Sequence, residues 1–490
     1  MKIAFFELTN ERFARSIQID HAVDLLREGH RVTWFRNDSP LSLFGEFVFT
    51  NFVDHKFDLS NSGKILESLA KKYSNFEISY FNIPKLKSLV GKEEIGVELS
   101  QKAWQEVTVL LRDSVPCKTH NFKDFKNYAS LLKNLNQTFT KMLAKGRWDR
   151  VVVYNGRFLR EFALWQASEQ LKIPIVFLER FNLDWNLRYF SFSEPVHSAD
   201  YRAQVIKGYF QVLPLAYSEK AAIANNWLHK RTVSRGTSFT QLQDTDFKPS
   251  RDFKEIIAFF HSSEDELYST GLDSVKWRNQ FDAIDEIIEL IKNCNDILFV
   301  VRVHPNLLAK SKREKLRWHK FISERSYSNV LFIPPESKIR SYDVLKKATK
   351  VLTFGSTIGI EATFFAKPSA LLSSALHSQL NALTKIDNSS ELRLFIFKRP
   401  SESVEIPFGA IAYGFFLETA GVFISNLEIL PETSDSQDPI FSYAGHALYH
   451  SKLLSALKRV EGILRKGTRH FKSLSCPLDH NPYMHNQVAG

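Results

Sequence analysis

The stretch of residues 297–373 constrains the fold of this chain more than any other. It contains three short apolar runs, each with the length and the β-branched or phenylalanine content of a buried strand, at residues 297–303, 330–333 and 351–354. Each run ends in a polar or glycine-containing turn and leads into a segment that can be helical. This alternation is typical of a parallel α/β sheet, in which ligands bind just outside the carboxyl ends of the strands.

Two of these predicted strand ends carry residues that suit a phosphate group. Arg302 and His304 lie at the end of the first run, and Ser356 and Thr357 follow the third. A helix predicted at residues 358–366 begins directly after the second pair. Because the N-terminus of a helix exposes backbone N–H groups, it favours a bound phosphate.

Two further features belong to the same predicted edge of the sheet. Glu361 lies about one turn into the helix, where its carboxylate can accept hydrogen bonds from ribose hydroxyls. The alternative is a capping Ser-Thr pair with a solvent-facing glutamate. Another strand, predicted from residue 255, ends at a third small-residue turn that contains Ser262 and Ser263. We therefore predict that these turns bind a nucleotide together.

The run VRVHPN, followed by FGSTIGIEATFFAKPS, resembles the nucleotide-binding domain of GT-B glycosyltransferases of capsule and surface-polysaccharide synthesis. Bacterial Kdo-transferase and sialyltransferase relatives share an HP motif and a downstream Ser/Thr-rich turn. The resemblance covers the C-terminal half well and the N-terminal half loosely. It implies an α/β chain with a GT-B-like fold, in which two Rossmann-like domains face each other across a cleft. It also implies that His304 and the Ser356-Thr357 turn contact the phosphate of a nucleotide sugar, with Glu361 toward the ribose or base.

The N-terminus opens with the same alternation of strand and helix. Residues 2–6 form a predicted strand, residues 11–28 a helix and residues 31–35 a second strand, without a GxGxxG fingerprint. In a GT-B enzyme the first turn would face the cleft, which makes Glu7 a candidate catalytic base. The alternative is that Glu7 and Asn10 cap the helix.

A second pair of strand ends in the N-terminal half carries the best acceptor-side residues. Predicted strands at residues 151–154 and 173–179 end in two groups of polar residues, Asn155, Gly156 and Arg157 in the first and Glu179 and Arg180 in the second. If the strands pair directly, these residues converge. Gly156 would admit a substrate to the backbone, Arg157 would hold an anionic group, and Glu179 would be the catalytic base. The alternative is two surface turns with a Glu–Arg ion pair.

The length of 490 residues leaves room for two core-bearing domains. We predict an N-terminal acceptor-side domain over residues 1–240 and a polar boundary at 240–253. A nucleotide-sugar-binding domain follows over 250–385. The extension 386–490 contains a predicted helix at 448–465 that packs back on the first domain, followed by a loose tail.

Several function classes are excluded by composition and spacing. The three cysteines (Cys117, Cys294 and Cys476) lie far apart, and no DxD motif follows a strand, so we expect no metal and no cofactor. No apolar stretch is long enough to span a membrane, and the N-terminal apolar run is too short for a secretory signal, so we expect a cytoplasmic protein. The net charge of +11 comes without a recognisable nucleic-acid module, and peripheral contact with an anionic membrane explains it as well.

The sequence thus predicts a glycosyltransferase that moves a sugar from a nucleotide-sugar donor to a surface-polysaccharide or lipid-linked acceptor. A CMP-activated acidic sugar such as Kdo is favoured slightly over a UDP-sugar, and the stereochemical outcome is open. A sugar-nucleotide 2-epimerase or a polyol-phosphate transferase of related fold is the alternative among enzymes. A basic nucleic-acid-binding protein is the alternative from another class.

Overall fold

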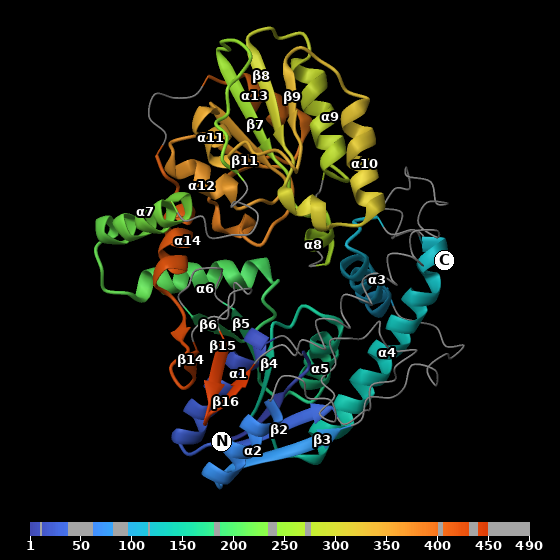
Figure 1. The fold of residues 1–490 in the computed structure, drawn as a ribbon, viewed down its shortest axis with the longest axis vertical. Coiled ribbons are helices and arrows are strands. Elements are labelled where there is room, and N and C mark those ends of the chain that lie inside the picture. The colour runs from blue at the N-terminus through green and yellow to red at the C-terminus, as the bar shows by residue number, and fades with distance from the viewer. Residues whose placement is uncertain are drawn as a thin grey trace. The chain divides into compact units, whose positions relative to one another are not determined.

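The computed structural model describes residues 1–9, 12–37, 62–81, 97–115, 118–180, 187–233, 243–269, 276–399, 405–430 and 440–448. Contacts within the chain divide it into two compact units, each built on its own sheet (Figure 1). The described parts of residues 1–106 and 118–196, together with 421–430 and 440–448, form the first unit. The described parts of residues 107–117 and 197–420 form the second unit.

The first unit contains a seven-stranded sheet in the order β13-β6-β5-β4-β1-β2-β3. Five of these strands are parallel: β1 (Lys2–Phe6), β2 (Arg31–Asn37), β3 (Phe76–Phe81), β4 (Arg150–Tyr154) and β5 (Ile175–Arg180). Of the other two, β6 (Arg188–Phe192) pairs antiparallel with β5, and β13 (Val422–Phe423) pairs antiparallel with β6. The predicted strands of the N-terminal half are therefore present, and the two expected to pair, β4 and β5, are neighbours.

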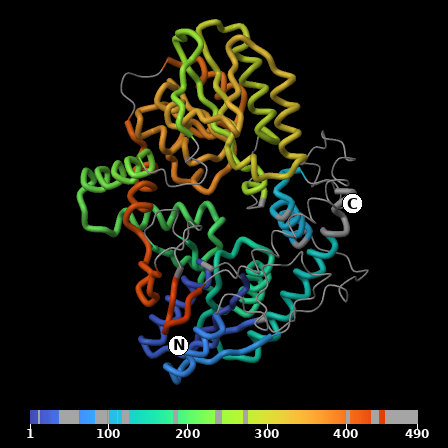
Figure 2. Tube along the Cα trace, in the orientation of Figure 1, coloured from blue at the N-terminus to red at the C-terminus, as the bar shows by residue number. Residues whose placement is uncertain are grey.

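Helices cover both faces of this sheet. On one face lie α1 (Arg12–Arg27), α2 (Ser62–Lys72) and a small sheet made of β14 (Glu428–Leu430), β15 (Ile440–Tyr443) and β16 (His446–Leu448). On the other lie α4 (Lys118–Lys145) and α5 (Leu159–Gln170). Figure 2 shows residues 440–448, in red, beside the blue N-terminal helices, and the Phe441 ring is 5.7 Å from that of Phe13.

The second unit contains a six-stranded parallel sheet in the order β12-β11-β10-β7-β8-β9. Its strands are β7 (Glu255–Phe260), β8 (Ile297–Arg302), β9 (Val330–Ile333), β10 (Lys350–Thr353), β11 (Ser369–Leu371) and β12 (Thr384–Lys385). One face is covered by α9 (Gln280–Ile291), α10 (Lys312–Ser323) and α13 (Ser389–Phe397), the other by α11 (Ser341–Lys347) and α12 (Ile358–Phe364) (Figure 1). Because both faces are covered, the central strands are continuous apolar runs without alternation.

Both sheets have the doubly wound strand order. Counted within each unit, the order is 3-2-1-4-5, so the winding reverses between β1 and β4 and between β7 and β10. Ligands of such sheets bind at this reversal, outside the carboxyl ends of the strands. The chain thus contains two Rossmann-like units, as GT-B proteins do, and the predicted α/β class with two Rossmann-like domains is confirmed.

The division between the units differs from the predicted boundary at residues 240–253. Residues 197–233, which contain α6 (Ala199–Val212) and α7 (Tyr217–Val233), belong to the second unit. Their aromatic residues pack on α14 (Phe408–Thr419), with Phe210 and Phe415 ring centres 5.4 Å apart and Trp227 and Tyr413 5.7 Å apart. The predicted extension is likewise divided, because residues up to 420 belong to the second unit and the chain returns to the first at 421.

The predicted helix at 448–465 and the tail after it lie outside the described residues, apart from Leu448, which ends β16. Within the described parts of the chain, none of the helices has both the length and the apolar character that crossing a bilayer requires.

Candidate functional site

The carboxyl edge of the second sheet brings together the turns that follow β7, β8 and β10. β7 and β10 pair directly, with Phe260 opposite Thr353, so Ser262 and Ser263 follow one strand and Ser356 follows its neighbour. Adjacent strands lie about 4.8 Å apart. The predicted donor-side turns therefore share one edge, at the point where the winding reverses.

His304, at the end of β8, is held against His261, at the end of β7. The backbone N–H of His304 donates to His261 Nδ1 (2.9 Å), and the N–H of Asn306 donates to His304 Nδ1 (3.0 Å). Burial lowers the pKa of His304 to about 4 and that of His261 well below its ordinary value. Both rings are therefore neutral at pH 7, and since Nδ1 accepts, Nε2 carries the proton. His304 is a neutral hydrogen-bond donor and not a cation.

In the turns after β7 and β11, two buried polar atoms have no hydrogen-bond partner among the described residues. The backbone of Ser262 is held by Gln280, whose Oε1 accepts from the Ser262 N–H and whose Nε2 donates to the Ser262 carbonyl (2.8 Å each). The Ser262 side chain is 6% exposed, yet its Oγ has no partner in the described chain. The same holds for Nε2 of His377, which is 4% exposed in the loop after β11. Buried polar groups of this kind usually have a partner in proteins, so each of these two atoms can form a hydrogen bond to a ligand or a water molecule.

The turn after β10 uses one of its own backbone N–H groups, and the helix that follows it is shorter than predicted. Gly355 has φ +126°, and the N–H of Ser356 donates to Thr353 Oγ1 (2.8 Å). The helix α12 has seven residues and ends at Phe364, before the predicted end at residue 366, and Thr357 makes no side-chain capping bond to it. Part of the expected set of phosphate-binding N–H groups is therefore used within the turn.

The predicted role of Arg302 as a phosphate ligand is corrected by its contacts. Its side chain is buried, and the guanidinium donates to the carbonyls of Val303 (3.0 Å), Pro334 (2.7 Å) and Ser337 (3.4 Å) and to the hydroxyl of Ser341 (3.3 Å). Burial lowers its pKa to about 10, so it stays charged at pH 7. Arg302 holds the loop after β9, because its guanidinium donates to the carbonyls of Pro334 and Ser337 in that loop.

Glu361 is also engaged within the second unit. One carboxylate oxygen accepts from Arg231 Nε on α7 (3.0 Å) and the other from the Tyr342 hydroxyl on α11 (2.6 Å). Glu361 is 2% exposed, and burial raises the pKa of Tyr342, so the phenol remains a donor. Both carboxylate oxygens thus have internal partners, and this geometry does not support the predicted contact with a ribose or base.

Two neighbouring carboxylates next to this edge, the half-buried Glu264 and the buried Glu314, were missed by the sequence analysis. Glu264, directly after the Ser262-Ser263 turn, accepts from the Gln280 N–H (2.7 Å), and burial, with a contribution from nearby Glu314, raises its pKa to about 7. Glu314 accepts from the hydroxyl (2.9 Å) and N–H (3.2 Å) of Ser114 and pairs with Arg317. The run SKRE at residues 311–314, a capping box, was the available signal for a helix start here.

Glu264 predicts a specific dependence of stability on pH. Its pKa in the folded protein is about 7 against an ordinary 4.5, so between these values the folded protein binds a proton that the unfolded chain has released. The contribution of Glu264 to the free energy of unfolding therefore decreases as pH rises from 4.5 to 7. Glu264→Gln keeps the acceptor and removes the titration. The free energy of unfolding is measured with urea at several pH values between 4.5 and 7. The difference between wild type and Glu264→Gln should shift against the wild type as pH rises, and a difference that does not change with pH would contradict the raised pKa of Glu264.

In the first unit, the predicted acceptor-side residues Asn155 and Glu179 are in contact. β4 and β5 pair with Tyr154 opposite Leu178, and Asn155 Nδ2 donates to Glu179 Oε2. Asn155 has φ +65° and Gly156 φ +82°, so the turn that follows β4 is left-handed. A Cβ atom on Gly156 would lie 2.5 Å from the Phe177 ring, which occupies the space that the sequence analysis assigned to a substrate.

The two arginines of this group lie on aromatic rings. The guanidinium carbon of Arg157 is 4.8 Å from the centre of the Phe158 ring, and that of Arg180 is 4.3 Å from the centre of the Phe13 ring. The N–H of Arg157 donates to Asn155 Oδ1 (2.9 Å). Asn155 and Glu179 are therefore in contact, and the guanidinium groups of Arg157 and Arg180 lie over aromatic rings.

A buried charged cluster that the sequence analysis did not identify lies next to this turn. Lys102, on α3 (Val97–Leu111), donates to the Arg157 carbonyl, and burial lowers its pKa to about 8. Glu161, in the first turn of α5, is 2% exposed, and burial raises its pKa to about 7. Arg160 Nη1 donates to the Leu8 carbonyl (3.2 Å) and so links the turns after β1 and β4. The adjacent pair Arg160-Glu161 within an apolar helix was the available signal.

Glu7, the second candidate base, is a structural residue. It is 1% exposed at the end of β1, and its carboxylate pairs with Arg15 Nε and Arg36 Nε (2.9 Å each). It also accepts from Trp34 Nε1 (3.0 Å) and the Ser62 hydroxyl (3.3 Å). Two guanidinium groups and two neutral donors engage both oxygens, so this carboxylate is not available to accept a substrate proton. Neither capping of α1 nor catalysis describes its role.

Among known proteins, only solved structures are similar to this chain. No family model matches the chain. No curated protein matches it. Similar solved structures include the KpsC β-Kdo 2,7-transferase of Thermosulfurimonas dismutans (13% identity, TM-score 0.36, covering 66% of this chain and 89% of that one) and its β-Kdo 2,4-transferase (10%, 0.33, 55% and 79%). They also include the UDP-GlcNAc 2-epimerase of Methanocaldococcus jannaschii in complex with UDP-GlcNAc and UDP (13%, 0.32, 84% and 97%). At these values the fold class rests on the strand order, and function has to be inferred from the side chains.

Within the described residues, no group of three or more histidine, cysteine, aspartate or glutamate side chains could hold a metal ion.

Proposed function

We propose that this protein is a glycosyltransferase that uses a nucleotide sugar, with the nucleotide bound at the carboxyl edge of the second sheet. One observation carries the proposal: the buried Ser262 hydroxyl has no partner at the β7–β10 reversal, where doubly wound sheets bind ligands. A donor phosphate accepts a hydrogen bond from this hydroxyl and from the neutral His304 ring. His377 Nε2, after β11, which has no partner among the described residues, adds a third polar group for the same ligand.

The acceptor side is assigned to the first unit, with Glu179 as the base. In an inverting transfer the acceptor hydroxyl oxygen attacks the anomeric carbon, and the bond from that carbon to the phosphate oxygen breaks. The nucleotide leaves with the bonding electrons and the hydroxyl proton passes to Glu179. Asn155 orients the Glu179 carboxylate by its hydrogen bond. The proposal assigns no role to a metal ion or cofactor.

The proposed donor is a CMP-activated acidic sugar such as Kdo, and a UDP-sugar is the second candidate. CMP-Kdo is supported by the HP motif at residues 304–305, which resembles the HP motif of capsule-synthesis enzymes such as Kdo transferases. The proposed acceptor is a surface polysaccharide or a lipid-linked glycan. Such an acceptor would place the enzyme at the cytoplasmic face of a membrane, where its net charge of +11 favours contact with anionic lipid.

Ser262→Ala tests the donor site. Because the Ser262 hydroxyl is buried without a partner, its removal should leave the melting temperature of the ligand-free protein unchanged or raise it. Removal of a hydrogen bond to a charged phosphate costs about 1.5–3 kcal/mol, so nucleotide affinity should fall about tenfold to a hundredfold. The measurement is a thermal-shift titration with CMP, UDP and their sugar conjugates, since a bound ligand stabilises by RT ln(1 + [L]/Kd).

Ser390→Ala, on an exposed position of α13, is the matched control and should change neither quantity. If the wild type and Ser262→Ala bind nucleotide with equal affinity, the Ser262 hydroxyl does not contact the nucleotide, and the proposed donor site is wrong. Conversion of UDP-GlcNAc to its 2-epimer without any acceptor would favour the epimerase alternative. Steeply salt-dependent binding of DNA or RNA, without nucleotide-sugar binding, would favour the nucleic-acid alternative.

A further inference from the structure

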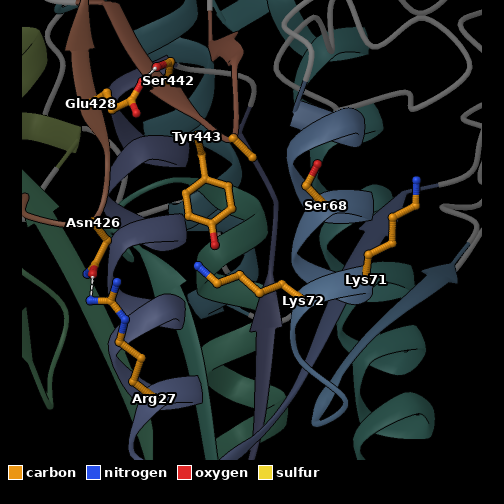
Figure 3. A pocket seen from close by; sticks show the side chains of 9 residues that line it. Arg27, Ser68, Lys71, Lys72, Asn426, Glu428, Ser442 and Tyr443 are labelled. Carbon is orange, nitrogen blue, oxygen red and sulfur yellow. Dashed lines mark hydrogen bonds between the residues drawn. The ribbon is translucent and has the colours of Figure 1, made fainter.

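The first unit contains a pocket of about 500 Å³ that none of the proposed catalytic steps uses (Figure 3). A volume of this size lies within the range of small-molecule sites in proteins. The residues that matter for its chemistry are three cations, a tyrosine, an amide and one carboxylate: Arg27, Lys71, Lys72, Tyr443, Asn426 and Glu428.

The pocket lies away from the carboxyl edge of the first sheet. Arg27 is the last residue of α1, which leads into β2, and Lys72 is the last residue of α2, which leads into β3. Both helices therefore end at the edge where these parallel strands begin. The 16 residues of α1 span about 24 Å at about 1.5 Å per residue, which separates the pocket from the turn that follows β1. Its ligand is thus not held by Glu179 or Asn155.

Hydrogen bonds between residues that are about 400 positions apart in the sequence hold one wall of the pocket in place. Asp20 Oδ1, on α1, accepts the backbone N–H groups of Ser425 (3.0 Å) and Asn426 (2.6 Å). The Asn426 side chain donates to Asp24 Oδ1 (2.8 Å) and accepts from the Arg27 guanidinium (Figure 3). The returning chain is therefore anchored to α1, and the wall is formed before any ligand binds.

The charges of the pocket favour an anion. Three cationic side chains line it against one carboxylate, that of Glu428, which accepts from the Ser442 hydroxyl (2.9 Å). The Lys72 ammonium lies 5.6 Å from the centre of the Tyr443 ring, and the neighbouring Tyr443 hydroxyl raises the pKa of Lys72, so Lys72 stays charged (Figure 3).

Cations in the last turn of a helix also offset the helix dipole, which accounts for the positions of these residues along α1 and α2. It does not account for the concave shape of the pocket, or for the serine, tyrosine and glutamate side chains that line it beside the cations. Ser68, Ser442 and Glu428 offer hydroxyl and carboxylate groups that pair with ligand hydroxyls, and the Tyr443 ring offers an apolar face. A ligand that uses all of these is an anion that also carries hydroxyl groups.

We propose that this pocket binds the phosphate group of a hydroxylated phosphomonoester or phosphodiester, at a site separate from the donor edge of the second unit. Arg27 and Lys72 donate to the phosphate oxygens in charge-assisted hydrogen bonds. Two sources share this chemistry, a soluble sugar phosphate and the headgroup of an anionic phospholipid that protrudes from a bilayer.

Two binding measurements on the full chain distinguish these sources. Calorimetric titration with glucose 1-phosphate tests the soluble ligand, and sedimentation with vesicles of phosphatidylglycerol and phosphatidylcholine tests the headgroup, with pure phosphatidylcholine vesicles as the blank. Lys72→Gln should weaken whichever interaction is seen about tenfold or more, because a hydrogen bond to a charged group is lost. Lys72 is exposed, so this variant should fold normally.

Lys64→Gln, an exposed lysine on the same helix outside the pocket, is the matched control and should bind as the wild type does. Ser262→Ala should also leave this binding unchanged, which separates the pocket from the donor site and keeps the two proposals independent. The proposal is overturned if neither probe binds, or if Lys72→Gln and Lys64→Gln bind equally well.

Discussion

Replacement of Glu179 by glutamine should reduce sugar transfer about 10²–10⁴-fold, the usual contribution of a general base, while nucleotide affinity stays as in the wild type. Glutamine keeps the shape of the side chain and can still accept the hydrogen bond from Asn155 Nδ2. It cannot accept the proton of the attacking hydroxyl. The rate is measured as acceptor-dependent nucleotide release, with whichever donor stabilises the wild type in the thermal-shift panel.

Glu169→Gln, an exposed position on α5 of the same unit, is the control and should transfer at the wild-type rate. If Glu179→Gln also transfers normally, the base lies elsewhere. Glu7 is then no substitute, because two arginines already engage its carboxylate. The buried Glu161, with a pKa of about 7, would be the next residue to test.

Replacement of Glu7 by glutamine should lower the free energy of unfolding by about 3–5 kcal/mol, because it leaves buried cations without their counterion. The Arg15 and Arg36 side chains that pair with Glu7 are 4% and 2% exposed, so water cannot replace the lost charge. Urea unfolding followed by circular dichroism measures the change.

Glu77→Gln, at an exposed position of β3, provides the comparison and should change stability by less than about 0.5 kcal/mol. Nucleotide binding by folded Glu7→Gln protein should be unaffected, because the proposed donor site belongs to the second unit. A variant as stable as the wild type, but without transfer activity, would restore Glu7 as a candidate base.

The strands were predictable because each is a short apolar run bounded by turn residues, a local signal. Residues 330–333 and 2–6 are strands with the predicted bounds. β4 and β8 differ from their predicted bounds by one residue at one end, and β5 and β10 differ by one or two residues at both ends. The alternation of strands and helices also predicted parallel sheets. Which polar residues follow each strand is likewise a property of the sequence, so the turns at Ser262, His304 and Ser356 were found at one edge of one sheet.

The roles of single side chains at these edges were not predictable, because their partners are distant in the sequence. Arg302 donates to the carbonyl of Pro334, Glu361 pairs with Arg231 130 positions away, and Glu7 pairs with Arg36. Each has the residue type and the position of a ligand-binding group. Only the packing of other elements shows that its hydrogen-bonding capacity is used internally.

The sequence by itself determined the α/β class, the parallel strands at the centre of both sheets and the residues that follow each strand, because hydrophobic periodicity and turn chemistry act over a few residues. The tertiary structure alone decided that α6 and α7 join the second unit and that the chain after 421 returns to the first. It also decided which polar side chains are satisfied within the protein and which, like Ser262, are buried without a partner. Burial and pairing depend on contacts between residues tens to hundreds of positions apart, and no local pattern in the chain encodes them.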